Sequence, residues 1–295
     1  MGHNMSNCVF EKVIVIGYGQ IVNNCIQKLN ELRNDYGFEL NFIEYENTAL
    51  SNSIELCERL GVAYNKLYEK SFVTEYLLSV NEETLVVSAG NFYIFPKEVV
   101  EKNNLTIINF HSALLPKYPG RNAQSWAIFC GEKEAGVTWH FVNEELDAGK
   151  YIIQKKCDIS EDTKAYELTG TIMNAAYDAF CEIIEGVLLD KYDKIQDVAI
   201  EKDRKVYKGK DIPGNGEFLL ADSAEYIYRL LRATDYGKSD IFPSIKTQIN
   251  GKTVRVSSYK KIKNEGINSL QYDEKAIYIP FDSEYVLRIK YKDII

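Results

Sequence analysis

The chain of 295 residues lacks several features that mark special classes of protein. No apolar run approaches the roughly eighteen residues that cross a bilayer, and no secretory signal pattern opens the sequence. The six cysteines form no Cys-x-x-Cys pair, and the three histidines leave little material for a His-based metal centre. We therefore expect a cytoplasmic protein with reduced thiols, without a metal and without a membrane partner.

What is present is typical of a globular protein: 45% of the residues are hydrophobic, 26% are charged, and neither repeats nor low-complexity tracts occur. The net charge of −8 is uneven. Residues 1–200 hold 17 Lys and Arg against 29 Asp and Glu, a balance of −12, whereas residues 201–295 hold 18 against 14, a balance of +4. We expect the first part to repel a phosphate backbone and the second to attract one only mildly.

The most informative stretch covers residues 106–122. It opens as a short apolar run, which predicts a buried strand, and it continues into a loop rich in Pro and Gly. Asn109 and His111 are two residues apart, so their side chains share one face of that strand. In open α/β sheets, ligands bind at the carboxyl end of such strands. An amide donor beside an imidazole at this place favours a site that stabilises an oxyanion and moves a proton.

Strand and helix patterns alternate through the first two thirds of the chain. This alternation predicts an α/β domain with a mostly parallel sheet and helices on both faces. Strands are expected at residues 12–16, 38–45, 62–65, 84–88, 106–111, 137–142 and 151–154, and helices after residue 20 and at 53–61, 72–80, 96–100, 123–130 and 163–188.

The last third of the chain has a different pattern. Residues 189–215 are polar, rich in Lys and interrupted by Gly and Pro, which indicates a linker. A helix at 221–232 follows, and the Asn250-Gly251 pair predicts a hairpin turn between two strands, with further strands at 276–279 and 285–289. We therefore expect three parts: a catalytic domain over residues 1–188, a linker over 189–215, and a small β-rich domain over 216–295.

Three groups of residues together resemble a known family. They are Asn109-Phe110-His111, then Leu114-Leu-Pro-Lys-Tyr118 with Gly120, and finally Asp147 two residues ahead of Gly149. These motifs are similar to the signature of the 10-formyltetrahydrofolate-dependent formyltransferases, which include methionyl-tRNA, glycinamide ribonucleotide and amino-sugar N-formyltransferases. Ser112-Ala113 departs from the Pro-Ser that the family usually has there. A combination spread over residues 109–149 is more specific than any single short motif.

The resemblance implies a Rossmann-like catalytic domain, a small β-rich carboxyl-terminal domain, and a set of site residues. His111 would handle the proton, Asn109 would donate to the oxyanion, and Asp147 would orient or charge His111. The cofactor 10-formyltetrahydrofolate would lie against Phe92, Ile94, Phe95, Leu115, Pro116, Asn143 and Leu146. The acceptor would bind at Gly120, Arg121 and Asn122, where the start of the next helix favours negative charge. No metal is implied.

The acceptor itself stays open between two kinds of partner. The chain carries little positive charge: −12 over residues 1–200 and only +4 over residues 201–295. This balance favours a small amine, most of all a nucleotide-linked amino sugar, over methionyl-tRNA. Formyltransferases of tRNA, however, also carry a carboxyl-terminal domain. The oligomeric state is open as well.

Other interpretations remain for single motifs. Gly17-x-Gly19 after a first strand, with Glu44 or Glu46 as a ribose ligand, is typical of a nicotinamide-dependent oxidoreductase, but Val22 replaces the third glycine of that pattern. A non-catalytic binding module is a further alternative. His140 is expected to be a structural or rim residue. Without the resemblance, Asp147 would be an ordinary turn residue.

Overall fold

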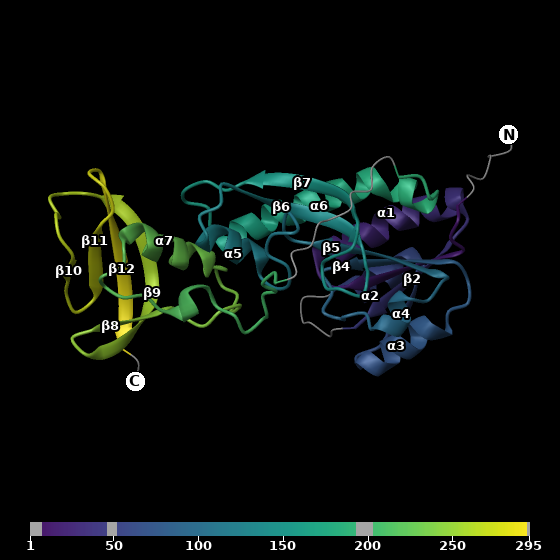
Figure 1. The fold of residues 1–295 in the computed structure, drawn as a ribbon, viewed down its shortest axis with the longest axis horizontal. Helices are drawn as coiled ribbons and strands as arrows, with labels where there is room; N and C mark the ends of the chain where they lie inside the picture. Colours follow the sequence, from purple (N-terminus) through teal and green to yellow (C-terminus); the bar gives the residue numbers. More distant parts are fainter. Residues whose placement is uncertain (1–7, 46–51, 193–202, 294–295) are drawn as a thin grey trace. The chain divides into compact units, whose positions relative to one another are not determined.

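The structure is a computed structural model that describes residues 8–45, 52–192 and 203–293 (Figure 1). Glu46 and residues 193–202 of the expected linker lie outside these ranges. The chain forms two compact units: residues 1–120, 136–157 and 171–206 make the first, and residues 121–135, 158–170 and 207–295 make the second. The expected boundaries at residues 188 and 215 stay a prediction, and each unit is described by itself below.

The first unit contains a seven-stranded sheet in the order β3-β2-β1-β4-β5-β6-β7. The pairs from β3 to β5 are parallel, and β6 runs antiparallel to β5. This arrangement confirms the predicted mostly parallel α/β fold. The strands are β1 (Lys12–Gly17), β2 (Glu39–Glu44), β3 (Ala63–Lys66), β4 (Thr84–Ala89), β5 (Leu105–His111), β6 (Glu134–Phe141) and β7 (Tyr151–Asp158).

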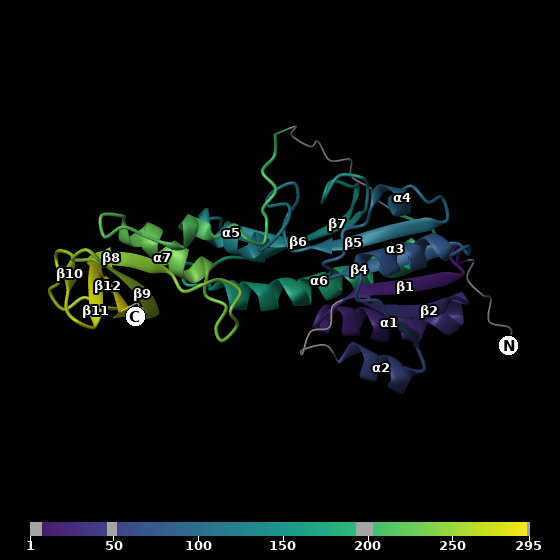
Figure 2. The same ribbon diagram turned by 90° about the horizontal axis from the view of Figure 1, so that it is seen from below.

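Helices cover both faces of this sheet (Figure 2). On one face, Val73 and Leu77 of α3 and Val99 of α4 pack with Ile14 and Val86 of the sheet. On the other face lie α1, α2 and α6, and the indole of Trp139 on β6 donates a hydrogen bond to a carbonyl of α6. Burial from both sides explains the unbroken apolar runs at residues 13–16 of β1 and 85–87 of β4. The helices are α1 (Gln20–Tyr36), α2 (Ser53–Leu60), α3 (Lys70–Ser79), α4 (Lys97–Val100) and α6 (Ala165–Leu188).

Gly17 at the end of β1 is explained by packing. Its φ is +143°, and a Cβ atom built there would lie 2.0 Å from the carbonyl oxygen of Ala89 at the end of β4. Only glycine permits this close approach of two parallel strand ends. The Gly17-x-Gly19 turn is therefore accounted for without a dinucleotide, and Glu44 accepts a hydrogen bond from the Tyr68 hydroxyl at 2.8 Å.

The second unit combines short helices with a five-stranded antiparallel sheet in the order β10-β11-β12-β9-β8. Helix α7 packs Ile227 and Leu230 onto Ile277 and Leu287 of this sheet. Asn250 and Gly251 both have positive φ and join β8 to β9, which confirms the predicted hairpin. The elements are α5 (Ala123–Phe129), a 3₁₀ turn (Pro213–Gly216), α7 (Ala224–Ala233), β8 (Lys246–Ile249), β9 (Lys252–Lys263), β10 (Gln271–Tyr272), β11 (Ala276–Pro280) and β12 (Tyr285–Asp293).

Candidate functional site

The pairing of β5 with β6 gathers polar side chains on one face of the first sheet. Asn109 lies directly opposite His140, and His111 lies opposite Thr138. Opposed residues on antiparallel strands project from the same face, so these four side chains share it. Phe110 and Trp139 are also opposed and project from the other face, where Trp139 contacts α6.

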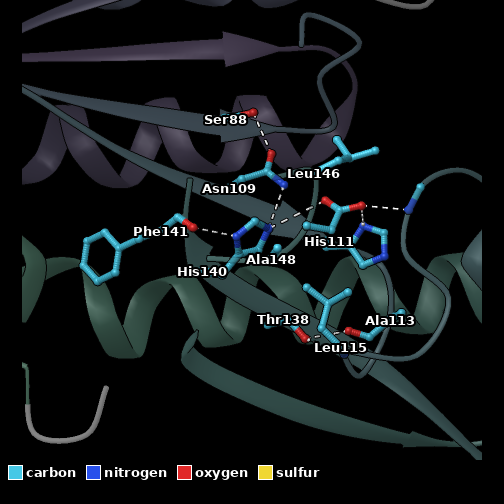
Figure 3. A network of polar contacts seen from close by, with 12 residues as sticks. Ser88, Asn109, His111, Ala113, Leu115, Thr138, His140, Phe141, Leu146 and Ala148 are labelled. Atoms are coloured by element: carbon cyan, nitrogen blue, oxygen red, sulfur yellow. Dashed lines mark hydrogen bonds and ion pairs between the residues drawn. The ribbon is translucent and has the colours of Figure 1, made fainter. Parts of the chain in front are cut away.

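A row of hydrogen bonds runs across three neighbouring strands (Figure 3). Ser88 on β4 lies opposite Asn109, and its Oγ donates to Asn109 Oδ1 at 2.7 Å. Asn109 Nδ2 is 3.2 Å from His140 Nε2, and His140 Nδ1 is 2.8 Å from the carbonyl oxygen of Phe141. Because that carbonyl accepts, Nδ1 carries the hydrogen and Nε2 accepts from Asn109. The amide is therefore fixed at both ends, and its second N–H hydrogen has no partner among the described residues.

The protonation of His140 agrees with this direction of hydrogen bonding. The side chain is 2% exposed, and its burial lowers the pKa below the ordinary 6.5, although the nearby carboxylate of Asp147 acts in the opposite direction. A lowered pKa keeps the ring neutral near pH 7, as an acceptor at Nε2 requires. Since His140 is almost completely buried, it does not lie at a rim; of the two expected positions, structural or rim, the structure supports the structural one.

His111 and Asp147 lie side by side in the same site. His111 Nδ1 is 3.5 Å from Asp147 Oδ2, and the other ring nitrogen is 3.0 Å from the carbonyl oxygen of Tyr118. Asp147 Oδ2 accepts the backbone N–H of Gly120 at 2.7 Å, and Oδ1 is 3.8 Å from His140 Nε2. One buried carboxylate thus faces two imidazoles, and both nitrogens of His111 face oxygen atoms.

The loop that carries Asp147 is held in an unusual backbone shape. Asp147 has a φ of +51°, in the left-handed region. Gly149 is pressed against β6 so closely that a Cβ atom there would lie 1.6 Å from the carbonyl oxygen of Phe141. The side chain of Asn143 links two parts of the loop. Its Nδ2 donates to the carbonyl of Ala148 and its Oδ1 accepts from the backbone amide of Glu145, both at 3.1 Å.

Thr138 holds the segment that follows His111. Its hydroxyl donates to the carbonyl of Ala113 at 2.6 Å and accepts the amide of Leu115 at 3.1 Å. The side-chain amide of Gln154 on β7 donates to Leu115 O and to Thr138 Oγ1, both at 2.9 Å. The Leu115-Pro116 peptide is cis. These hydrogen bonds fix the loop through its backbone carbonyl and amide groups. Ser112-Ala113, which stands where the family usually has Pro-Ser, leaves these backbone groups able to form the bonds.

Four of the seven residues expected to contact folate fall into two groups. Ile94 is 61% exposed and Leu146 is 42% exposed, so both offer apolar surface that a flat ring system can cover. Phe92 instead stacks on Tyr18 with ring centroids 4.9 Å apart, and Phe95 packs edge-on against Tyr93. The apolar surface at Ile94 and Leu146 fits a pterin, and the contacts themselves stay a prediction.

The expected acceptor residues straddle the two units. Gly120 belongs to the first unit and donates to Asp147, whereas Arg121 and Asn122 open the second unit. Arg121 is exposed, and its backbone N–H donates to the carbonyl of Tyr207 at 2.8 Å. Acceptor binding by these residues therefore stays a prediction.

Two further properties concern ligands and membranes. Within residues 8–45, 52–192 and 203–293, no three His, Cys, Asp or Glu side chains are grouped so that they would hold a metal ion. No helix in the same ranges combines the length and the apolar character that a membrane crossing requires.

The structure adds Ser88 and Thr138 to the residues singled out in the sequence, and it places His140, which was expected to be a structural or rim residue, in the row of hydrogen bonds. A signal for two of them was present: Thr138 and His140 are two apart on an expected strand and so share a face. The sequence did not give the register of β5 with its neighbours. The pairing of β5 with β6 places His140 opposite Asn109, and the pairing of β4 with β5 places Ser88 opposite Asn109.

Comparison with known proteins finds relatives for a large part of the chain. Residues 45–184 match the family model described as formyl transferase. The chain is 29% identical over 247 residues to the methionyl-tRNA formyltransferase of Thermodesulfovibrio yellowstonii, covering 80% of this chain and 75% of that protein. It is 28% identical over 186 residues to the methionyl-tRNA formyltransferase of Clostridioides difficile, covering 59% of this chain and 58% of that protein. The match thus spans little more than half of this second relative.

Solved structures share the fold over almost the whole chain. The sugar 3N-formyl transferase WlaRD, with dTDP and 5-N-formyl-THF, has a TM-score of 0.72 at 18% identity and covers 97% of this chain and 99% of its own. An N-formyltransferase from Helicobacter canadensis, in complex with folinic acid and dTDP-3-aminofucose, has a TM-score of 0.73 at 17% identity, covering 96% and 100%. The motifs and the matched segment together support a formyl transferase domain over residues 45–184.

Proposed function

We propose that the protein transfers a formyl group from 10-formyltetrahydrofolate to a primary amine, and that the acceptor is a nucleotide-linked amino sugar. One observation carries the proposal: Asn109, His111 and Asp147 converge at the carboxyl end of β5, inside the segment that matches the formyl transferase family model. An oriented amide, an imidazole and a carboxylate are the groups that acyl transfer to an amine requires.

The chemistry divides among these side chains. The bound folate supplies the formyl group in activated form, so no residue needs to be acylated. The attacking amine must lose a proton, and His111 is the group that takes it, while the carboxylate of Asp147 at 3.5 Å stabilises the resulting imidazolium. The bond between the formyl carbon and the folate nitrogen then breaks, and the proton held by His111 passes to that nitrogen, so that tetrahydrofolate leaves. The free N–H of Asn109 donates to the oxygen of the formyl group as negative charge develops there. Ser88 and His140 keep that N–H in place.

Two observations support a sugar acceptor: the charge of the chain, and the ligands present in solved structures that share the fold. Residues 1–200 hold 29 acidic against 17 basic side chains, which disfavours a long phosphate backbone near the site. Arg121 directly follows Gly120 in the sequence, so a cation stands next to the site residue Gly120 along the chain, and a guanidinium can bind a compact phosphate. Both solved structures named above were obtained with dTDP or a dTDP-linked amino sugar.

A second candidate acceptor is methionyl-tRNA, favoured by one surface of the second unit. Arg288, Lys290 and Lys292 alternate along β12 on the face opposite to the buried Leu287 and Ile289. Their cross-strand neighbours on β9 include Lys260, opposite Arg288, and Arg255, opposite Lys292. We call these five cations the basic face. A row of cations on one sheet face is typical of proteins that bind a phosphate backbone.

The deciding experiment offers the protein 10-formyltetrahydrofolate together with either dTDP-linked amino sugars or methionyl-tRNA and follows the release of tetrahydrofolate. We expect turnover with a sugar and loss of turnover in Asn109→Ala.

Efficient formylation of the tRNA with no sugar accepted would refute the sugar proposal. In that case, the double variant Arg255→Gln, Lys292→Gln, which removes two cations of the basic face, should weaken the reaction with tRNA only. A fluorescence titration with NADH addresses the oxidoreductase alternative, and saturable binding there would favour it.

A further inference from the structure

Arg204 contacts the loop of Asp147 although it lies 57 residues further along the chain. Its Nη1 donates to the carbonyl oxygen of Asp147 at 3.1 Å, and its Nη2 donates to the carbonyl oxygen of Leu146. Both contacts lie within the first unit. A guanidinium holds two donors in one rigid plane, so a single side chain grips two consecutive carbonyl groups.

These two carbonyl groups control the direction of the Asp147 side chain. The carbonyl of Leu146 belongs to the peptide plane before Asp147, and the carbonyl of Asp147 belongs to the plane after it. Fixing both planes fixes φ and ψ between them, and with them the direction of the Cα–Cβ bond. External support is needed here because the φ of +51° lies in a region that residues other than glycine rarely occupy.

The other contacts of the loop do not replace this grip. Asn143 bonds to Glu145 and Ala148, on either side of the bend. Gly149 fixes where the loop rejoins β7. The hydrogen bond from Gly120 N–H holds one carboxylate oxygen, not the backbone. Among the described residues, Arg204 is the side chain that bonds the two carbonyls adjoining the Asp147 Cα.

We infer that Arg204 is a positioning residue, which sets the backbone bend at Asp147 and so directs its carboxylate toward His111. Arg204 touches no reacting atom. The inference rests on the proposed function only in its kinetic part, where Asp147 and His111 move a proton together. A displacement of about 1 Å in a catalytic group commonly costs about a hundredfold in rate. We therefore expect Arg204→Met to lower kcat ten- to a hundredfold and to leave the KM for folate within about twofold.

Two further variants make the kinetic result specific. Arg204→Lys keeps the positive charge but lacks the two coplanar N–H donors of the guanidinium. Its kcat should therefore lie between that of Arg204→Met and that of the parent. Lys208→Met removes an exposed cation four residues further along the chain, whose side chain has no hydrogen bond or ion pair within the described residues, and it should keep the kcat of the parent. If Arg204→Met and Lys208→Met have the same kcat as the parent, the inference is wrong. If Arg204→Met does not fold, a kcat of Arg204→Lys equal to the parent's leads to the same conclusion.

Amide hydrogen exchange gives a test that needs no turnover. When the carboxylate of Asp147 turns away, the N–H of Gly120 loses its acceptor, so its exchange should become at least tenfold faster in Arg204→Met. The N–H of Phe141, which donates to Lys150 at 2.9 Å, serves as an internal reference for the fold. Unchanged protection of Gly120 overturns the inference. If the parent transfers no formyl group to any amine, the proposed function fails, and the exchange result still decides the role of Arg204.

Discussion

Replacing His140 with leucine tests the row of hydrogen bonds that orients Asn109. The leucine fills a position that is only 2% exposed and is of similar size, but it neither accepts nor donates a hydrogen bond. Asn109 Nδ2 then loses its acceptor at 3.2 Å, and the carbonyl of Phe141 loses its donor at 2.8 Å. Ser88 still holds the oxygen end of the amide.

The expected magnitudes follow from these contacts. Each of the two buried polar groups left without a partner costs about 1–3 kcal/mol, and the well-buried leucine offsets part of the sum, so we expect a net loss of about 1–3 kcal/mol in the free energy of unfolding. Complete loss of an oxyanion donor costs about a hundred- to a thousandfold in kcat. Because Ser88 keeps the amide partly oriented, we expect a loss of ten- to a hundredfold.

The pH dependence of stability provides a second signature of His140. Its folded-state pKa is lowered by burial below the ordinary 6.5, so the unfolded chain binds the proton more readily. The contribution of the neutral ring to stability is complete above pH 6.5 and is lost as the pH falls through the folded-state pKa. The leucine variant has no such component. The gap in free energy of unfolding between parent and variant should therefore narrow as the pH falls from 7.5 to 5.

The assay combines steady-state formyl transfer with urea unfolding at several pH values. His140→Gln serves as a matched variant, because its amide can accept from Asn109 and donate to Phe141 without titrating. It should recover much of the lost kcat and share the flatter pH dependence. A kcat of His140→Leu within about threefold of the parent, together with an unchanged gap across the pH range, would refute the reasoning.

Four other predictions concern the same site. His111→Ala and Asp147→Asn should each lower kcat by orders of magnitude with folate binding nearly intact, and activity within a fewfold of the parent would exclude the proton role. Asn109→Ala should lower kcat by about a hundred- to a thousandfold with KM little changed, whereas a defect in KM alone would make it a binding residue. Ser88→Ala, which removes one hydrogen bond of about 1–1.5 kcal/mol, should lower kcat by about tenfold, and parent-like kinetics would remove Ser88 from the row. Gly149→Ala should lower the urea midpoint sharply because its Cβ would meet Phe141 O, while Gly170→Ala, with nothing within 4 Å, should not; equal midpoints would contradict the close approach.

Local patterns were sufficient for much of the fold. Buried strands such as β1 and β4 are short apolar runs, and the Asn250-Gly251 turn supplies the positive φ that its hairpin needs. Errors occurred at element ends, where few residues decide. The expected helix start at residue 163 moved to Ala165, because Thr163 instead accepts the N–H of Ser160 in a turn. β10 has two residues, too few for any periodicity to show.

The candidate site divides in a similar way. Asn109 and His111 follow from spacing on one strand, and Asp147 was found only through the family resemblance, since Asp ahead of Gly is common in turns. Ser88, His140 and Arg204 reach the site through strand register or through a contact 57 residues away. Spacing within one segment carries no information about such pairings. The long-range contacts that position the groups are therefore what the sequence could not supply.

The arrangement also explains how a polar face persists beside a closely packed sheet. A buried polar group without a partner is costly, and here the oxygen of Asn109, both nitrogens of His140 and one oxygen of Asp147 each have a hydrogen-bonding partner. What is left over is the second N–H of Asn109, held in a fixed direction by contacts made in the absence of substrate. In the proposed reaction, a donor that is already oriented needs no reorganisation when charge develops on the formyl oxygen. The same hydrogen bonds therefore offset the cost of burying the polar face and leave the second N–H of Asn109 without a protein acceptor among the described residues.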